Sequence, residues 1–417
     1  MVIEENIRSS FDWVIGTKIE MFHSGNETSR QTRTAAAEIK QSRPTCIVFV
    51  NYVAGSYGSL LSELNCLYPK FEKKPTLLFY IYGNFTLEPG TWARIGVTIA
   101  DWPAYFVCAS RRQSNLVRSF LPPASEKNVV TRPFPVKTVH FRYDPALRRQ
   151  IRLERRWKGQ FIFLYVGRLA SQKNVLPLVK HWLKATEHLS EPVKLVLAGA
   201  FDDSRSLLFR KRSARVGRYR LELNKYLSSL PENKRAQIEY AGSFSPEELR
   251  GVYNAADCYV SLSTYHDEDF GMAPAEALAT GLPAILSDWG GYSDFGASPG
   301  QCFLMPVAIR SAGIVMKDRI FHEHVMKVVR ERGRHRELRD RNARAFARQY
   351  SPRKVGQSLN ALLCARPPVF RGFSSKLHFF AQLVDVRAGA GVYESSSTAD
   401  SLYFLNYSHY TGQNFSL

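Results

Sequence analysis

Four charged residues of this sequence could bind and activate a phosphorylated ligand. Arg168 and Lys173 lie within the stretch "GRLASQK", and Glu268 and Glu276 flank the stretch "DFGMAPA". An arginine can bind two phosphate oxygens at once, and a lysine adds a mobile point charge. Two such cations could stabilise a diphosphate whose negative charge grows during a reaction. On spacing alone, each could equally be an ordinary surface cation.

The two glutamates lie around the expected start of a helix. Pro274 suits the first helical position, where its missing N–H is not needed, and Ala273 would then be a cap residue without a capping oxygen. The free backbone N–H groups there could bind a ligand anion or hydroxyl groups. Glu268 would lie in the loop before the helix and Glu276 in its first turn. In the alternative interpretation, Glu276 only complements the helix dipole and Glu268 is a solvated loop acid.

Two series of apolar stretches predict the strands that would position these residues. The first series covers 46–50, 77–82 and 105–110, and the second covers 161–166, 193–199, 238–242, 257–263 and 283–288. Helical patterns separate the strands of the second series, at 174–190, 219–230, 246–255 and 273–281. Strands that alternate with helices predict parallel sheets with right-handed crossovers. The fold class is therefore α/β, with two doubly wound Rossmann-like domains that face a central cleft.

Ligands of such sheets bind beyond the carboxyl ends of the strands. Three loops follow strands of the second series, at 167–173, 242–245 and 264–274. We therefore expect these loops, and the charged residues within them, to form one site.

The length of 417 residues suits two domains with additional segments. The predicted organisation is an N-terminal segment, a first Rossmann-like domain, a second Rossmann-like domain, a helix that crosses back and a tail. Their ranges are 1–45, 46–155, 156–348, 349–366 and 367–417. The six cysteines are far apart and form no metal-binding spacing, which indicates reduced thiols in a cytoplasmic protein. The sequence shows neither a signal peptide nor an apolar run of spanning length.

The chain carries a net charge of +20, which favours anionic ligands, anionic membranes or nucleic acid. Residues 205–220 hold seven Lys/Arg and no acid, residues 111–158 hold thirteen against three acids, and residues 327–354 hold eleven against three. Each segment alone could be a solvated helix face. No nucleic-acid-binding module is recognised, so we expect no nucleic acid partner.

Several stretches together resemble the retaining GT-B glycosyltransferases of glycosyltransferase family 4. They are "YVGRLASQKN", "YAGSFSPEELRGVYNAADCYVSLS", "EDFGMAPAEALATGLPAILSDWGG" and "RQYSPRKVGQSLNALL". The most specific elements are the E-x7-E pair and the upstream G-R-x4-K. The resemblance is clear over 160–295, fair over 75–160, weak before 45 and absent after about 366.

The resemblance implies a nucleotide-sugar donor, with a UDP, GDP or ADP leaving group, and no metal ion or other cofactor. It also implies that the domain at 156–348 binds the nucleotide sugar and that the domain at 46–155 contacts the acceptor. Arg168 and Lys173 would neutralise the departing diphosphate, and Glu268 would lie at the donor sugar. Glu276 would bind the ribose hydroxyls. The other implied donor-binding residues are Gly167, Gly242 and Ser243, the last two beside the nucleobase, and the backbone N–H groups of Phe270, Gly271 and Met272.

The sequence also departs from the family pattern. Many relatives have Gly where Asp269 stands, so an additional carboxylate lies beside the expected sugar position. Tyr82 precedes Gly83 where the family often has a His. The N-terminal domain is predicted to be shorter than usual by one or two elements, and 205–220 is a basic insertion.

These observations predict a retaining hexosyltransferase of surface polysaccharide or lipopolysaccharide biosynthesis. Its acceptor would be a glycan or a lipid-linked glycan, and its basic segments would bind the inner face of an anionic membrane. Two alternatives stay open at this point. One is a soluble transferase that acts on a small molecule or protein, and the other is a degenerate GT-B binding module without activity.

Overall fold

The computed structural model describes eleven stretches of the chain. These are residues 2–14, 29–50, 57–69, 72–86, 88–202, 218–265, 268–297, 301–310, 313–365, 367–387 and 410–411. The chain divides into two compact units, which are described separately below. Unit 1 comprises Met1–Pro135 and Pro352–Ala390, and unit 2 comprises Val136–Ser351 and Gly391–Leu417. Most of the basic insertion at 205–220 lies outside the described residues.

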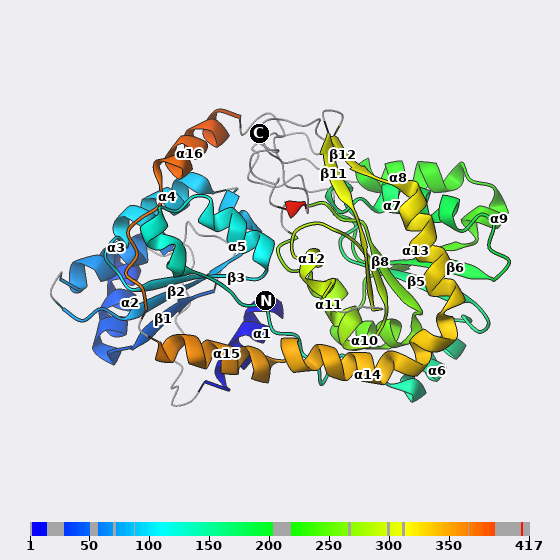
Figure 1. The fold of residues 1–417 in the computed structure, drawn as a ribbon, viewed down its shortest axis with the longest axis horizontal. Helices are drawn as coiled ribbons and strands as arrows, with labels where there is room; N and C mark the ends of the chain where they lie inside the picture. The colour runs from blue at the N-terminus through cyan, green and yellow to red at the C-terminus, as the bar shows by residue number, and fades with distance from the viewer. Residues whose placement is uncertain are drawn as a thin grey trace. The chain divides into compact units, whose positions relative to one another are not determined.

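Unit 1 contains a parallel four-stranded sheet in the order β1-β2-β3-β4 (Figure 1). The strands are β1 (Cys46–Phe49), β2 (Thr76–Ile81), β3 (Ala104–Cys108) and β4 (Val129–Thr131). The first three agree with the predicted apolar stretches. β2 and β3 are buried because helices cover the sheet, whereas β1 is mostly half-buried. β4 was missed, because three residues are too few to show a pattern.

Helices of unit 1 come from both ends of the chain. They are α1 (Val2–Phe11), α2 (Ser29–Ser42), α3 (Gly58–Leu67), α4 (Pro89–Thr98), α5 (Arg111–Arg118), α15 (Pro352–Cys364) and α16 (Ser375–Arg387), with 3-10 turns η2 (Gly83–Thr86) and η3 (Pro123–Asn128). α1 packs against α15, and α16 packs against α4. Phe370 and Phe373 place their rings 4.9 Å and 5.4 Å from that of Phe106. The first part of the predicted tail therefore completes the core of unit 1.

Unit 2 contains a parallel six-stranded sheet in the order β10-β9-β8-β5-β6-β7. Its strands are β5 (Phe161–Val166), β6 (Val193–Ala198), β7 (Ile238–Gly242), β8 (Cys258–Ser261), β9 (Ala284–Ser287) and β10 (Cys302–Met305), and an antiparallel hairpin pairs β11 (Val307–Arg310) with β12 (Gly313–Met316). From the centre of the sheet, β5, β6 and β7 follow one another toward one edge, and β8, β9 and β10 follow one another toward the other edge. The reversal between β5 and β8 is the position at which doubly wound sheets bind ligands.

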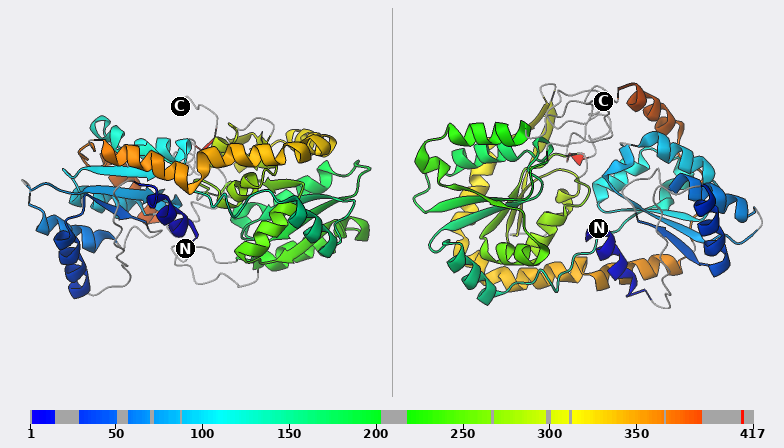
Figure 2. Two further views of the ribbon diagram at one scale, coloured as in Figure 1. Left: turned by 90° about the horizontal axis from the view of Figure 1, so that it is seen from below. Right: turned by 180° about the vertical axis from the view of Figure 1, so that it is seen from behind.

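Helices cover both faces of the unit 2 sheet, as Figures 1 and 2 show. They are α6 (Pro145–Glu154), α7 (Val175–Ala185), α8 (Arg218–Ser228), α9 (Glu232–Arg235), α10 (Pro246–Ala255), α11 (Met272–Ala279), α12 (Tyr292–Phe295), α13 (Asp318–Arg330) and α14 (Arg332–Tyr350), with the 3-10 turn η4 (Ser171–Lys173). α7 and α13 contribute a large buried cluster with the strands, in which Trp182 and Phe163 meet edge to face at 6.0 Å. α10 begins with a capping box between Ser245 and Glu248.

The boundary between the units lies earlier than the predicted boundary at 155 and 156. α6 belongs to unit 2 because its Arg148 donates hydrogen bonds to the last carbonyls of α10 and to Asp257. These groups lie about a hundred residues further along the chain. Composition alone could not assign the segment, because proline residues precede it in a region without strand pattern.

Candidate active site

Two of the predicted site loops meet at the strand-order reversal of unit 2. β5 and β8 are neighbours, with Leu164 paired with Tyr259, so the loops that follow them lie side by side. Asn174 ties them together, since its side-chain amide donates to the Leu262 carbonyl at 3.0 Å and to the Thr264 hydroxyl at 2.8 Å. This contact fixes the start of α7 against the loop after β8.

Lys173 and Glu268 form an ion pair across these loops. The side chain of Lys173 is 16% exposed and that of Glu268 only 5%, so the pair is largely shielded from water. Attraction between shielded charges is stronger than on the surface. The structure therefore joins a residue of the GRLASQK stretch to the first glutamate of the E-x7-E pair.

Arg168 and Lys173 contact the same aromatic ring, that of Tyr265. The Arg168 guanidinium is 5.6 Å and the Lys173 ammonium 4.6 Å from the centre of that ring, so both cations face one aromatic surface. Arg168 also forms an ion pair with Asp202 at 2.5 Å. Burial lowers the pKa of Arg168, but its hydrogen bond to Asp202 reverses the effect and leaves the pKa above its ordinary value.

Asp202 and Tyr265 are two site neighbours that the sequence analysis did not identify. Asp202 directly follows Phe201 in the stretch "FDDS", and it is the partner of Arg168. Tyr265 comes shortly after β8, at the sheet edge where ligands bind, and this position was the available signal.

Helix α11 begins two residues earlier than predicted. Met272 is its first residue, Gly271 is the cap and Pro274 is the third residue rather than the first. Gly271 has φ +92°, and a Cβ atom there would lie 2.4 Å from the Tyr292 ring, so both conformation and space require glycine. No side chain caps the helix, so the backbone N–H groups at its start are not used by a capping side chain.

The residues between Glu268 and α11 divide into backbone and core roles. The Phe270 ring packs 5.4 Å from Phe295 and 5.9 Å from Tyr350, so its side chain belongs to the core of unit 2. Met272 is half-buried. A ligand could therefore use only the backbone of Phe270, which is the part that the family resemblance assigns to it.

Glu276 lies on the fifth residue of α11 rather than in the first turn, and it is buried. The Tyr253 hydroxyl donates to its carboxylate at 3.1 Å. Burial raises the pKa of Glu276 to about 7, although this hydrogen bond opposes the shift. Burial and the nearby Glu276 charge raise the pKa of Tyr259. The Tyr259 hydroxyl donates to the Val166 carbonyl at 3.1 Å, so Tyr259 lies between Glu276 and the end of β5.

The region that contains these loops is similar to known proteins. Residues 148–306 match the family described as glycosyl transferases group 1. They form a glycosyltransferase domain of this family. The match covers β5 to β10 and includes all the predicted site residues.

Similar curated proteins match parts of the chain. Mannosylfructose-phosphate synthase of Agrobacterium fabrum is 26% identical over 219 residues, which are 52% of this chain and 42% of that protein. Lipopolysaccharide 1,2-N-acetylglucosaminetransferase of Salmonella typhimurium is 26% identical over 173 residues, 42% of this chain and 41% of that protein. The chain thus spans less than half the length of these curated relatives.

A solved structure extends the similarity to most of the chain. The Anabaena HepE protein in complex with UDP and glucose aligns over 87% of this chain and 95% of its own, with a TM-score of 0.62 and 11% identity. At that identity the likeness concerns the fold. Both units are Rossmann-like, and the chain has the GT-B fold.

Three glycines of the glycosyltransferase domain lie in close backbone contact at the carboxyl ends of β5, β6 and β7. They are Gly167, Gly199 and Gly242. The Gly199 N–H donates to the Gly242 carbonyl at 2.8 Å, and a Cβ atom on Gly199 would lie 2.0 Å from the Gly167 carbonyl oxygen. The chain ends of β5, β6 and β7 can approach this closely only without side chains. Ser243 is exposed directly after Gly242. Gly199 was not predicted as a site residue.

Protonation of Glu276 predicts a pH-dependent nucleotide affinity. In the role that the family resemblance implies for Glu276, ribose hydroxyls would donate to its carboxylate, so nucleotide binding would favour the ionised form. With a folded pKa of about 7, affinity for the nucleotide should rise between pH 6 and pH 8, and binding should release protons. Calorimetry in two buffers of different ionisation enthalpy measures this release. Glu276→Gln should remove the pH dependence, and an unchanged profile in this variant would contradict the assignment.

The same carboxylate affects stability with the opposite sign. The folded pKa of Glu276 lies above its ordinary value, so between the two values the folded state holds a proton that the unfolded state has lost. The free energy of unfolding should therefore fall as pH rises from about 4.5 to about 7. This contribution should be absent from Glu276→Gln.

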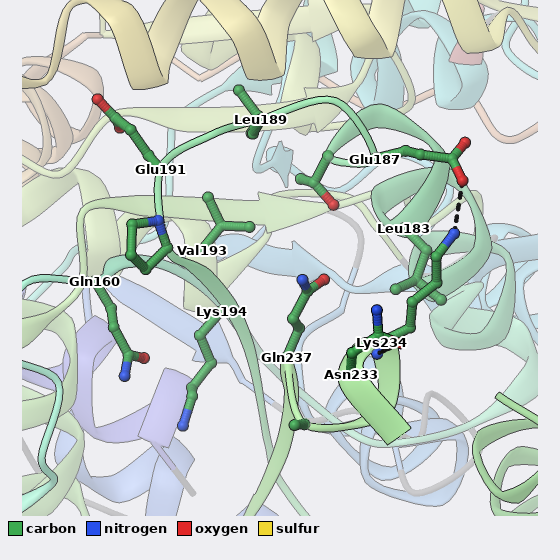
Figure 3. A pocket seen from close by; sticks show the side chains of 13 residues that line it. Gln160, Leu183, Glu187, Leu189, Glu191, Val193, Lys194, Asn233, Lys234 and Gln237 are labelled. Carbon is green, nitrogen blue, oxygen red and sulfur yellow. Dashed lines mark hydrogen bonds and ion pairs between the residues drawn. The ribbon is translucent and has the colours of Figure 1, made fainter. Parts of the chain in front are cut away.

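One pocket lies away from these loops, at the amino ends of β5 to β7 (Figure 3). It measures about 360 Å³ and includes the ion pair of Lys234 and Glu187, at 2.7 Å. Its mixed lining identifies no ligand, and it contains none of the predicted site residues.

Neither a metal site nor a membrane-spanning helix is present among the described residues. They contain no group of three or more His, Cys, Asp or Glu side chains that could hold a metal ion. They also contain no helix that is long and apolar enough to cross a membrane.

In unit 1, Tyr82 is buried with its ring 5.4 Å from that of Phe134, and burial raises its pKa.

Proposed function

We propose that the protein is a retaining glycosyltransferase that transfers a sugar from a nucleotide-sugar donor. The observation that carries this proposal is the cluster of Arg168, Lys173 and Glu268 around Tyr265, beside the strand-order reversal. It contains two cations for a diphosphate and one acid for a sugar. The group 1 match over residues 148–306 supports it.

The charges suggest the reaction step. Breaking the bond between the anomeric carbon and the diphosphate oxygen leaves positive charge on the sugar and negative charge on the nucleoside diphosphate. Arg168 and Lys173 would stabilise the leaving diphosphate, as a metal ion does in other transferases. Glu268 would lie at the sugar, and a donor diphosphate would compete with it for Lys173. The acceptor hydroxyl oxygen then forms the new bond to the anomeric carbon with retained configuration, and its proton passes to the departing diphosphate.

The acceptor belongs to the same proposal. We assign a glycan or lipid-linked glycan of surface polysaccharide or lipopolysaccharide biosynthesis, at the cytoplasmic face of an anionic membrane. Support comes from the net charge of +20 and from the similarity to a lipopolysaccharide N-acetylglucosaminetransferase. A basic surface next to a membrane gains about 1 kcal/mol per Lys or Arg near it. A soluble small-molecule acceptor would need no such field.

The first test is donor hydrolysis without acceptor. The full-length protein is incubated with a panel of UDP-, GDP- and ADP-sugars, and nucleotide release is measured for the wild type and Glu268→Ala. We expect slow release from one donor and its loss in the variant. If the protein shows no turnover and binds none of these nucleotides in calorimetry, the result contradicts the proposal and favours a degenerate binding module.

A liposome sedimentation series tests the location. Vesicles with anionic lipid should retain the protein at low salt and release it at high salt, because surface charges are screened. Vesicles of neutral lipid are the control. Equal retention on both would contradict the electrostatic assignment.

A further inference from the structure

Tyr410, close to the C-terminus, lies in the core of unit 2 rather than on its surface. Its side chain is only 1% exposed, and the adjacent Thr411 is 5% exposed. The family resemblance ends near residue 366, so neither residue belongs to a motif considered above. A buried tyrosine in this segment requires contacts that hold it there.

Three contacts attach Tyr410 to the loops of the candidate site. Its hydroxyl donates a hydrogen bond to the Asp269 carboxylate, directly beside Glu268. Its backbone carbonyl accepts from the Gly290 N–H at 3.1 Å. Its ring meets the Trp289 indole edge to face, with centres 5.7 Å apart and planes at 87°. Both backbone and side chain therefore define its position.

The loop that Tyr410 contacts lies directly on the Glu268 segment. The Gly291 N–H donates to the Glu268 carbonyl at 2.7 Å, and a Cβ atom on Gly290 would lie 2.3 Å from the same oxygen. The Trp289 indole N–H donates to the Tyr265 carbonyl at 2.9 Å. Tyr265 is the residue whose ring faces both cations. A chain of contacts therefore connects Tyr410 to the cations: Tyr410 packs on Trp289, Trp289 bonds to Tyr265, and the Tyr265 ring faces Lys173 and Arg168.

We propose that Tyr410 is a positioning residue for the donor-sugar part of the site. It acts through Asp269, which many members of the family replace with glycine, and holds the Glu268 segment against the turn at 289–291. This inference rests on the proposed transferase function. Small displacements of catalytic groups cost much of the rate, so a residue that only fixes Asp269 affects turnover strongly.

The test compares the nucleotide with the nucleotide sugar on the full-length protein. The donor comes from the hydrolysis panel, and the variants are Tyr410→Phe and Tyr410→Ala. Tyr226→Phe, on α8, is the matched control for loss of a tyrosine hydroxyl. We expect Tyr410→Phe to lower kcat for donor hydrolysis by about tenfold or more, as for loss of a hydrogen bond to a charged group. Affinity for the free nucleoside diphosphate should stay within about twofold, because the hydroxyl of Tyr410 that Phe lacks contacts Asp269 on the sugar side of the proposed site.

A double-mutant comparison separates positioning from general packing. If the hydroxyl acts through Asp269, then Asp269→Asn combined with Tyr410→Phe should lose little more activity than either change alone. Additive losses would overturn the proposal. So would equal losses of nucleotide and nucleotide-sugar affinity, or a rise in turnover of Tyr410→Ala, which would mean that the residue obstructs the site. A wild type that binds no nucleotide would overturn the proposed function, and this inference with it.

Discussion

Replacing Lys173 by methionine should lower kcat for donor hydrolysis by about two to three orders of magnitude. The ammonium group of Lys173 is the shielded partner of Glu268 and shares the Tyr265 ring with Arg168. Removing it leaves one cation for a diphosphate that gains charge as it departs. Methionine keeps most of the length of the side chain, so the change concerns charge rather than volume. Nucleotide release followed over time measures the effect.

Lys184→Met is the matched control for this experiment. Lys184 lies on α7, and its side chain is 69% exposed and pairs with Asp318 at 2.6 Å. Exposed pairs of this kind contribute little, so turnover should be nearly unchanged. If Lys173→Met and Lys184→Met have equal activity, Lys173 does not stabilise the leaving group.

Replacing Asp257 by alanine should lower the free energy of unfolding by about 3–5 kcal/mol. The Asp257 side chain is only 2% exposed and accepts from Arg148 at 2.6 Å and from Arg152 at 3.0 Å. It also accepts from the backbone N–H of Ile162 at 2.9 Å, at the beginning of β5. Removing the carboxylate leaves two buried or nearly buried guanidinium groups without their counter-charge. Chemical denaturation measures the loss.

Asp318→Ala provides the comparison for this second change. The Asp318 carboxylate is 43% exposed and pairs with His181 and Lys184, so its removal should cost well under 1 kcal/mol. Burial alone would raise the pKa of Asp257, but Arg148, Arg152 and Arg332 bring it below the ordinary value. Its contribution to stability should therefore be present at neutral pH and be lost as pH falls through that lowered pKa. Similar losses in the two variants would contradict the role assigned to Asp257.

The sequence by itself determined most elements of the glycosyltransferase domain. The buried run at β5, the apolar stretch at β7 and the helical pattern at α10 agree with the structure to the residue. Such signals are local, because a strand buried on both faces is apolar throughout and a capped helix carries its cap in the sequence. The order of strands and helices then placed the loops with Arg168, Lys173 and Glu268 at one edge of a sheet.

Features that depend on contacts with distant parts of the chain were missed or misplaced in the sequence analysis. α1 and α2 are amphipathic helices within a polar segment, and their partners lie elsewhere in the chain. The start of α11 was placed too late, because proline statistics favour the first position, whereas the conformation of Gly271 decided it. The boundary between the units depended on contacts of Arg148 with residues about a hundred positions away.

Only the tertiary structure decided which charges are partners. Lys173 and Glu268 are 95 positions apart, Arg168 and Asp202 are 34 apart, and Tyr410 and Asp269 are 141 apart. No periodicity spans such separations, because the pairing depends on which strands become neighbours. Residue types and local spacing determined what chemistry the loops could perform. The strand order of the folded sheet decided which side chains meet there and raised the pKa of Glu276 by burying it.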